Sequence, residues 1–167
     1  MKKIILLIVM LIGLISCNIY NEGKLMIPEM VVQNKISKKF PITKNYIIAK
    51  GVLESPKVAF KGDKLHLDMK YVLSGLGEEF KGNMKISSGI KFDSETKEIY
   101  MVGLNVDEIT NNQGDKIDDA KAIAALKQIV SNYFETQPVY KYENEDGKKL
   151  NIKNIVIENG NLYVETK

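Results

Sequence analysis

The residue types that most often perform acid–base chemistry occur close together at one place, His66 and Asp68. A histidine beside a carboxylate can move protons in a catalytic site. No nucleophilic side chain can be identified next to this pair, and the residues around it alternate between apolar and polar types, as in a strand with one wet face. That alternation directs both side chains to water. We therefore predict a solvated strand surface here rather than a catalytic site.

Carboxylates and amides also gather between Asp107 and Asp119. A calcium loop of the EF-hand type needs Asp or Asn at its first, third and fifth positions before the glycine. Counting back from Gly114 puts Ile109 first, so the spacing fails, and helix capping by Asp115 is the simpler interpretation. The chain has one Cys and one His, which excludes an intramolecular disulfide, multi-cysteine sites and histidine-rich metal sites. We expect no metal, no cofactor and no enzymatic activity.

The only cysteine, Cys17, follows a short apolar segment near the start of the chain. Two lysines precede Ile4 to Ile15, an apolar run that suits a signal peptide and is shorter than the roughly 20 residues that span a bilayer. The sequence Leu14-Ile15-Ser16-Cys17 resembles the bacterial lipobox. This resemblance implies lipidation of Cys17 and cleavage after Ser16. The alternative is an uncleaved membrane anchor in which the cysteine falls here by chance.

The N-terminus therefore predicts both the division of the chain and its location. Residues 1–16 are expected to be a lipoprotein signal peptide, residues 17–24 the lipidated cysteine and a tether, and residues 25–167 a single α+β domain resembling lipid-binding ones. Several acyl chains on one residue hold a protein firmly to a membrane. We expect a lipid-anchored protein of the cell envelope. Asn18 after the cysteine favours the outer membrane, facing the periplasm, if the source is Gram-negative.

The charge balance excludes one class of partner. Lys and Arg total 24 against 21 Asp and Glu, and every basic residue is lysine. Without Lys2 and Lys3 the net charge is +1. Because nucleic-acid binding rests on an excess of positive charge, we expect no nucleic-acid partner. The first third of the chain is rich in lysines, which either rest on anionic lipid headgroups or form an ordinary solvated surface.

Two helices are predicted, one before and one after a group of strands in the sequence. The first opens at Pro28, places Val32 and Ile36 on one apolar stripe and ends before Pro41. The second runs from about residue 116 to residue 134, with apolar residues at helical spacing and small alanines beside them.

Four segments between the helices alternate in period two, which predicts strands with one buried face. They cover residues 46–54, 64–73, 80–92 and 100–106. Near the C-terminus, Asn159-Gly160 lies between two apolar segments and predicts a type I′ hairpin, which pairs Ile157 with Leu162 and Ile155 with Val164. The order of elements indicates an α+β fold with a largely antiparallel sheet. Two helices cannot cover a flat sheet of six or seven strands, so we expect the sheet to curl around them.

The whole pattern resembles the YceB-like bacterial lipoproteins, a family of undefined function similar to half of a tubular lipid-binding (TULIP) module. The resemblance rests on the lipobox and on the order and spacing of several short segments. These segments are Lys39-Phe40-Pro41, Ser88-Gly89-Ile90-Lys91-Phe92-Asp93, Asn132-Tyr133-Phe134, Gln137-Pro138-Val139-Tyr140, Asp146-Gly147 and the closing hairpin. It implies a curved, largely antiparallel sheet wrapped around a long helix, with an additional N-terminal helix. It implies no catalytic residue.

Two functions remain open at this point. In the first, the apolar strand faces and the second helix form a groove for a lipid or another apolar ligand. The residues expected to line it are Met69, Met84, Ile86, Val102, Leu104, Leu126, Val130 and Phe134. In the second, the same residues form a closed core, and the protein is a structural or assembly lipoprotein that binds an envelope protein partner.

Overall fold

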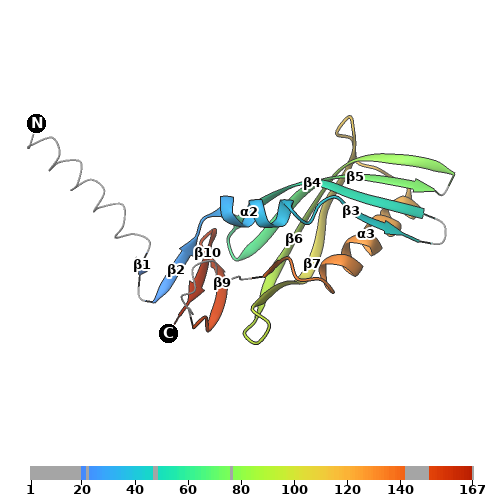
Figure 1. The fold of residues 1–167 in the computed structure, drawn as a ribbon. Helices are drawn as coiled ribbons and strands as arrows, with labels where there is room; N and C mark the ends of the chain where they lie inside the picture. The colour runs from blue at the N-terminus through green and yellow to red at the C-terminus, as the bar shows by residue number, and fades with distance from the viewer. Residues whose placement is uncertain (1–19, 22, 47–48, 76, 142–150, 167) are drawn as a thin grey trace, which may run out of the picture.

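The computed structural model describes residues 20–21, 23–46, 49–75, 77–141 and 151–166. They form two antiparallel sheets and two helices (Figure 1). The large sheet has the order β3-β4-β5-β6-β7-β8, and its strands are β3 (Ile42–Asn45), β4 (Ala49–Lys61), β5 (Lys64–Gly75), β6 (Glu78–Asp93), β7 (Glu98–Asn111) and β8 (Tyr140–Lys141). The small sheet has the order β1-β2-β10-β9, and its strands are β1 (Tyr20–Asn21), β2 (Lys24–Ile27), β9 (Asn154–Glu158) and β10 (Asn161–Glu165).

The alternating sequence of the large sheet gives it one apolar and one polar face. In β5, for example, Leu65, Leu67 and Met69 are at most 2% exposed, whereas His66 and Asp68 between them are half-buried. Successive side chains of a strand point to opposite faces, so the apolar residues of neighbouring strands meet on one side. The segments predicted at 64–73, 80–92 and 100–106 are confirmed as parts of β5, β6 and β7. The segment predicted at 46–54 is confirmed from Ala49, where β4 begins.

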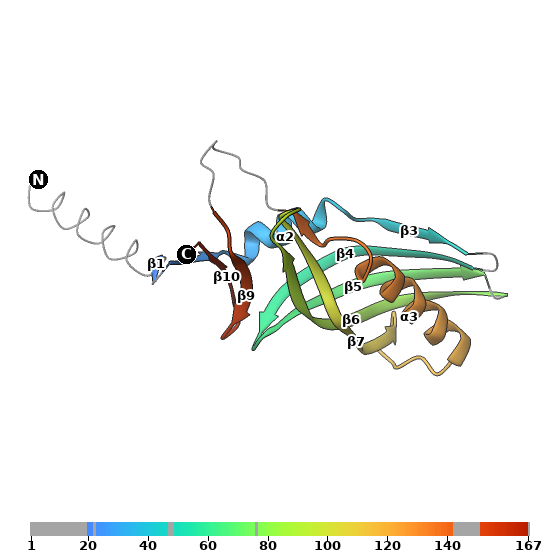
Figure 2. The same cartoon turned by 90° about the horizontal axis from the view of Figure 1, so that it is seen from below.

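Helix α3 (Ala120–Phe134) lies along the apolar face of the large sheet (Figure 2). Its buried residues are Ala122, Leu126, Ile129, Val130 and Phe134. The helix begins later than predicted, because the chain before it stays bonded to β7. Lys116 bridges to Thr110, and the Ile117 N–H donates to the Ile109 carbonyl. The N-cap is therefore Asp119, whose carboxylate accepts from the Ala122 N–H, and not Asp115.

The fold class expected from the sequence, a sheet wrapped around a long helix with an additional N-terminal helix, is wrong. The molecule is mostly antiparallel sheet, and its helices are short: α3 has 15 residues and α2 (Glu29–Ser37) has 9. At about 1.5 Å per residue α3 spans roughly 22 Å, while the 16-residue β6 spans about 53 Å at 3.3 Å per residue. A helix of that length covers less than half of the strand.

A second reason for the difference is the C-terminal hairpin, which does not extend the large sheet. β10 pairs with β2, a strand close to the N-terminus, so the hairpin builds a separate small sheet. The hairpin itself is confirmed, since Ile157 pairs with Leu162 and Ile155 pairs with Val164. Its turn residues have φ of 50° at Asn159 and 74° at Gly160, as a type I′ turn requires.

Candidate functional site

The residues predicted to line an apolar groove are mostly core residues. Met69, Met84, Ile86, Leu126, Val130 and Phe134 are each at most 1% exposed and belong to the hydrophobic core. Leu104 is half-buried and packs against that core. Val102 is 39% exposed and is not among the core residues. The structure therefore brings six of the eight residues together and fills the space between them with side chains of α3 and the sheet.

The packing of α3 is close over the C-terminal half of the helix. A Cβ atom added at Gly51 would stand only 2.3 Å from the Cδ1 atom of Ile129, so the Ile129 side chain occupies the space beside this glycine. The Phe134 ring lies 5.1 Å from the Tyr133 ring and 6.4 Å from that of Phe40, measured between ring centres. Aromatic pairs at these separations are favourable beyond the area they bury.

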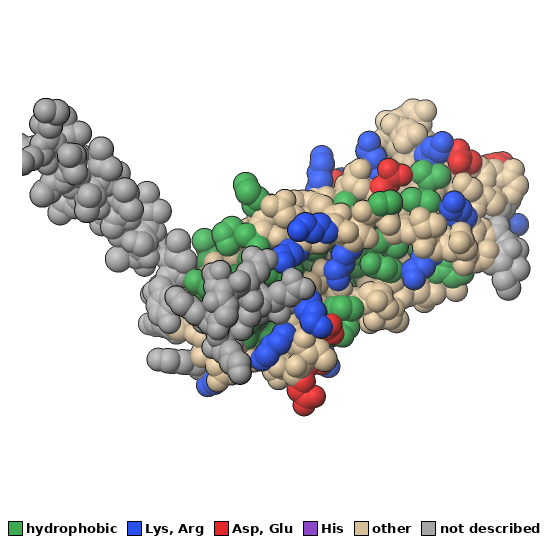
Figure 3. Space-filling model, viewed as in Figure 1, with side chains coloured by type: hydrophobic (Ala, Val, Ile, Leu, Met, Phe, Trp, Pro, Cys, Tyr) green, Lys and Arg blue, Asp and Glu red, His purple; other side chains and the backbone are tan. Residues whose placement is uncertain are grey.

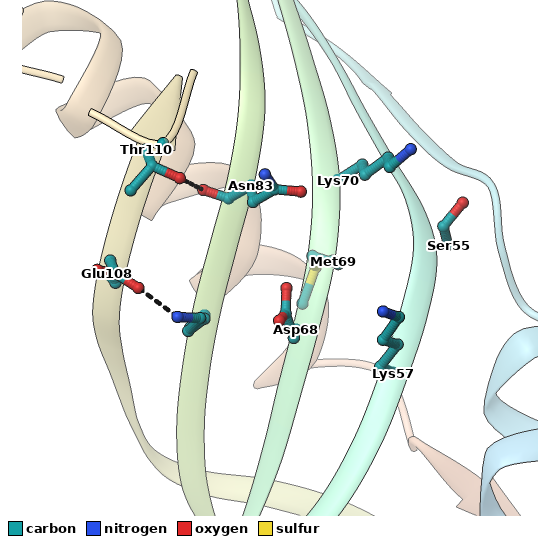
Figure 4. Close-up of a pocket in the computed structure, with 10 residues that line it drawn as sticks. Ser55, Lys57, Asp68, Met69, Lys70, Asn83, Glu108 and Thr110 are labelled. Carbon is teal, nitrogen blue, oxygen red and sulfur yellow. Dashed lines mark hydrogen bonds and ion pairs between the residues drawn. The ribbon is translucent and has the colours of Figure 1, made fainter. Parts of the chain in front are cut away.

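A hollow of about 430 Å³ lies on the large sheet among residues of its polar face (Figure 4). Its lining residues are Ser55, Lys57, Asp68, Met69, Lys70, Asn83, Lys85, Glu108, Thr110 and Gly114. One row of opposed residues runs across four strands in the order Lys57, Asp68, Lys85 and Glu108. A second row follows in the order Glu54, Lys70, Asn83 and Thr110. Charged and amide groups from four strands thus share one concave surface.

A β-bulge shapes one side of this hollow. The register of β4 against β5 shifts between Glu54 and Lys57, and Ser55 has a φ of 53°, in the left-handed region. A bulge bends its strand and redirects side chains. Gln33 of α2 holds the bulge from the other side, since its amide nitrogen donates to the Pro56 carbonyl at 2.7 Å and its amide oxygen accepts from the Val58 N–H at 2.7 Å.

The charges in the hollow are only partly matched. The Lys85 ammonium donates to the Glu108 carboxylate, and this hydrogen-bonded ion pair raises the pKa of Lys85 and lowers that of Glu108. Within the described part of the chain, Lys57, Lys70 and Asp68 have no ion pair. Figure 3 shows lysine side chains spread over the visible face of the molecule rather than gathered in one basic patch.

A second hollow of about 300 Å³ shares Lys57, Asp68 and Lys85 with the first and contains His66 and Asp107. The histidine Nδ1 lies 3.9 Å from the Asp107 Oδ2, so its nearest carboxylate comes from β7 and is not the Asp68 suggested by the sequence spacing. Sequence reasoning missed Asp107 as a partner because it is distant in the chain, and only the pairing of three strands brings it near.

The His66 cluster does not have the geometry of an activated nucleophile. The Ser87 hydroxyl opposite His66 donates to Asp107 at 2.9 Å, so its proton is directed to a carboxylate and not to the imidazole. Activation of a serine needs its hydrogen bond to reach the base. As predicted, His66 and Asp68 share the polar face of the sheet, where both are half-buried.

The acidic segment between β7 and α3 is explained by local hydrogen bonds. The Asn111 side-chain oxygen accepts from the N–H groups of Gln113 and Asp115, both at 2.9 Å, which holds a tight turn. Among the described residues, no three His, Cys, Asp or Glu side chains are placed to hold a metal ion.

The predicted signal peptide and Cys17 lie outside the described residues. β1 and the first residue of β2 fall inside the segment predicted to be a tether, and β1 pairs with Lys24 and Leu25 of β2. No helix in the described ranges has the length and apolar character needed to cross a membrane.

Comparison with known proteins gives a family but no activity. The model of a family described as a protein of unknown function, DUF1439, matches residues 27–161. The match begins at the end of β2 and reaches the start of β10, so it includes both helices and the whole large sheet. No curated protein matches the chain.

Proposed function

We propose that this chain, which belongs to the DUF1439 family of proteins of unknown function, is a membrane-anchored lipoprotein of the cell envelope that binds a protein partner. In this proposal residues 1–16 are a signal peptide, Cys17 carries the lipid anchor, and residues 25–167 form one domain with a binding rather than a catalytic role. The lipobox resemblance and the likeness to YceB-like lipoproteins support the anchor.

Burial supports a protein partner over an apolar ligand. Six of the eight side chains expected to line a lipid groove are at most 1% exposed, and α3 packs against them. A lipid acyl chain would have to displace these side chains. Interiors are close-packed, and displacement gives up the contacts that the core already makes. Binding at the outer surface needs no such change.

Helix α2 supplies an apolar surface suited to such a partner. Met30 is 73% exposed and Val31 is 41% exposed, while Val32 and Ile36 of the same helix are buried in the core. Single exposed apolar residues are common, but two large ones in sequence on a helix whose other side is anchored form a small contact site. We propose that a partner with an apolar surface packs on Met30 and Val31.

A photo-crosslinking side chain at position 30 tests the partner-binding role in intact cells. Irradiation is expected to give a discrete adduct of the protein with another polypeptide. The same side chain at Lys50, an exposed position on β4, serves as the control and is expected to give none. Equal adducts at both positions, or no adduct at position 30, would rule out α2 as the contact.

The anchor is tested separately. Labelling of cells with a fatty-acid analogue is expected to mark the protein, and the Cys17→Ser variant is expected to lose the label and keep the signal peptide. If the variant is labelled and processed like the original chain, the lipoprotein proposal is wrong.

A lipid-binding role is a second candidate, and one observation favours it. A hollow of about 300 Å³ lies between β5, β6 and the loop before α3, where Tyr71, Phe80 and Ile117 line it beside charged and amide side chains. Native mass spectrometry of the protein in detergent distinguishes the two roles, because a groove predicts a co-purifying lipid besides the anchor and a closed core predicts none.

A further inference from the structure

We propose that the hollow on the polar face of the large sheet binds a phosphate-bearing ligand with a neighbouring ammonium group, the chemistry of phosphoethanolamine. Lys57 and Lys70 would hold the phosphate, and Asp68 would hold the ammonium. The proposal does not rest on the partner-binding role or on the lipid anchor, because the residues that would contact the ligand belong to strands β4, β5 and β6.

The unmatched charges indicate this ligand. Among the described residues, the ammonium groups of Lys57 and Lys70 have no ion pair. The Asp68 carboxylate has none either, although it interacts at longer range with the charge of Lys85. Lys85 differs, since Glu108 already neutralises it. The groups of the hollow without a close ion pair therefore comprise two positive charges and one negative charge. A ligand that carries a phosphate and one ammonium group matches both signs, whereas a simple anion would leave Asp68 unmatched.

Hydrogen-bonding groups lie beside these charges. Figure 4 shows Ser55, Lys57 and Lys70 on one side of the hollow, with Asp68 nearer its middle and Glu108 on the far side. The Ser55 hydroxyl and the Asn83 amide can donate to phosphate oxygens, which accept several hydrogen bonds at once. The volume of about 430 Å³ lies within the range of small-molecule sites.

The backbone beside the hollow is strained, and a solvated strand does not require strain. Ser55 has a φ of 53° although it is not glycine, a conformation that persists only where the surrounding structure imposes it. Two hydrogen bonds of the Gln33 side-chain amide impose it here: its nitrogen donates to the Pro56 carbonyl, and its oxygen accepts from the Val58 N–H. The bulge turns Ser55 and Lys57 toward the hollow, which is the usual role of a bulge near a binding site.

The competing explanation is a charge ladder without a ligand. Opposite charges on neighbouring strands stabilise a sheet, and the row Lys57, Asp68, Lys85, Glu108 alternates in sign. A ladder predicts paired charges along its whole length. Only its last step, Lys85 to Glu108, is a close ion pair, and the step from Asp68 to Lys85 is a longer-range interaction.

Calorimetric titration of the full-length protein in uncharged detergent tests the proposal. At about 0.15 M salt, where exposed charges are screened, phosphoethanolamine is expected to bind saturably and more tightly than inorganic phosphate. The double variant Lys57→Gln/Lys70→Gln is expected to bind phosphoethanolamine at least about tenfold more weakly, since it loses two charge-assisted contacts. Asp68→Asn is expected to remove the preference over inorganic phosphate.

Lys91→Gln is the matched control, because it removes one exposed lysine of β6 that does not line the hollow. Its affinity is expected to equal that of the original chain. The proposal is overturned if neither probe binds saturably, if the double variant binds as well as the original, or if Lys91→Gln weakens binding equally. Thermal melting of each variant identifies any that fail to fold, and Asp68→Asn then gives an independent test through the ratio of the two affinities.

The source of the ligand is distinguished by competition. Micelles doped with a short-chain phosphatidylethanolamine are expected to displace phosphoethanolamine if the site takes a lipid headgroup. A lack of displacement assigns the site to the free compound. Both results require the same chemistry at Lys57, Lys70 and Asp68.

Discussion

Gly82 in β6 lies against the backbone of Thr110 in β7 so closely that a Cβ at position 82 would stand 1.8 Å from the Thr110 carbonyl oxygen. The same carbonyl accepts a hydrogen bond from the buried Tyr71 hydroxyl at 3.2 Å. Because Gly82 has no side chain, β6 can approach the Thr110 carbonyl of β7 while the Tyr71 hydroxyl donates to the same carbonyl. Glycine within a strand often marks such a close approach.

Replacement of Gly82 by alanine is expected to be strongly destabilising. The atoms that a new Cβ would meet are backbone atoms of β7, which cannot move as a flexible side chain can. We expect a loss of unfolding free energy at or above the upper end of the ~1–3 kcal/mol typical of overpacking, measured by chemical denaturation. Gly89→Ala in the same strand is the control, because its Cβ would meet nothing closer than 3.5 Å. Equal stability of the two variants would contradict the close approach.

The Gln33 side chain is expected to stabilise the β4 bulge. In Gln33→Ala the Pro56 carbonyl and the Val58 N–H lose their partner, and an unsatisfied polar group that is buried costs about 1–3 kcal/mol. Hydrogen exchange at the Val58 amide should accelerate accordingly. Asn34→Ala, one residue further along α2 at an exposed position, should change neither quantity. An unchanged exchange rate at Val58 in Gln33→Ala would show that the bulge is held by other contacts.

Met84→Trp separates a filled core from an open groove. Met84 is 0% exposed, so the larger ring must displace packed neighbours, and we expect a stability loss of about 1–3 kcal/mol with a clear fall in melting temperature. Val102→Trp, at a position 39% exposed, should leave the melting temperature nearly unchanged. A Met84→Trp protein that melts like the original would indicate empty space at this position and would revive the lipid-binding candidate.

The sequence predicted the parts of this fold that depend on local patterns. Alternation located the long strands, and Asn159-Gly160 located the hairpin, because the residue types that a type I′ turn accepts are few. It did not predict where the hairpin pairs. β2 is only four residues long, and its pairing with β10 joins segments more than 130 positions apart, which no local pattern encodes.

The candidate hollow was beyond sequence reasoning for the same physical reason. Asp68 and Lys57 could be recognised in the sequence as polar strand residues. That they lie opposite each other follows only from the register between β4 and β5, which the sequence does not show. The bulge at Ser55 was also hidden, since it depends on a side chain of α2. For α3, the helical spacing of the apolar residues was predicted correctly, but the start of the helix was not. The residues from 116 onward were expected to be helical, and the bridge between Thr110 and Lys116 keeps the first of them beside β7.

Asp93 is expected to titrate below its ordinary pKa of 3.8. Its Oδ1 accepts from the Thr96 N–H at 3.1 Å and from the Glu95 N–H at 2.8 Å, and these hydrogen bonds to the charged form lower the pKa of the carboxyl. Because the folded pKa is the lower one, the stabilisation is complete above the ordinary value and is lost as the pH falls through the folded pKa. In an NMR pH titration, the Glu95 and Thr96 amide shifts should share a midpoint below 3.8, and Asp93→Asn should abolish that transition. A shared midpoint at or above the ordinary value would mean that these hydrogen bonds do not hold the turn in solution.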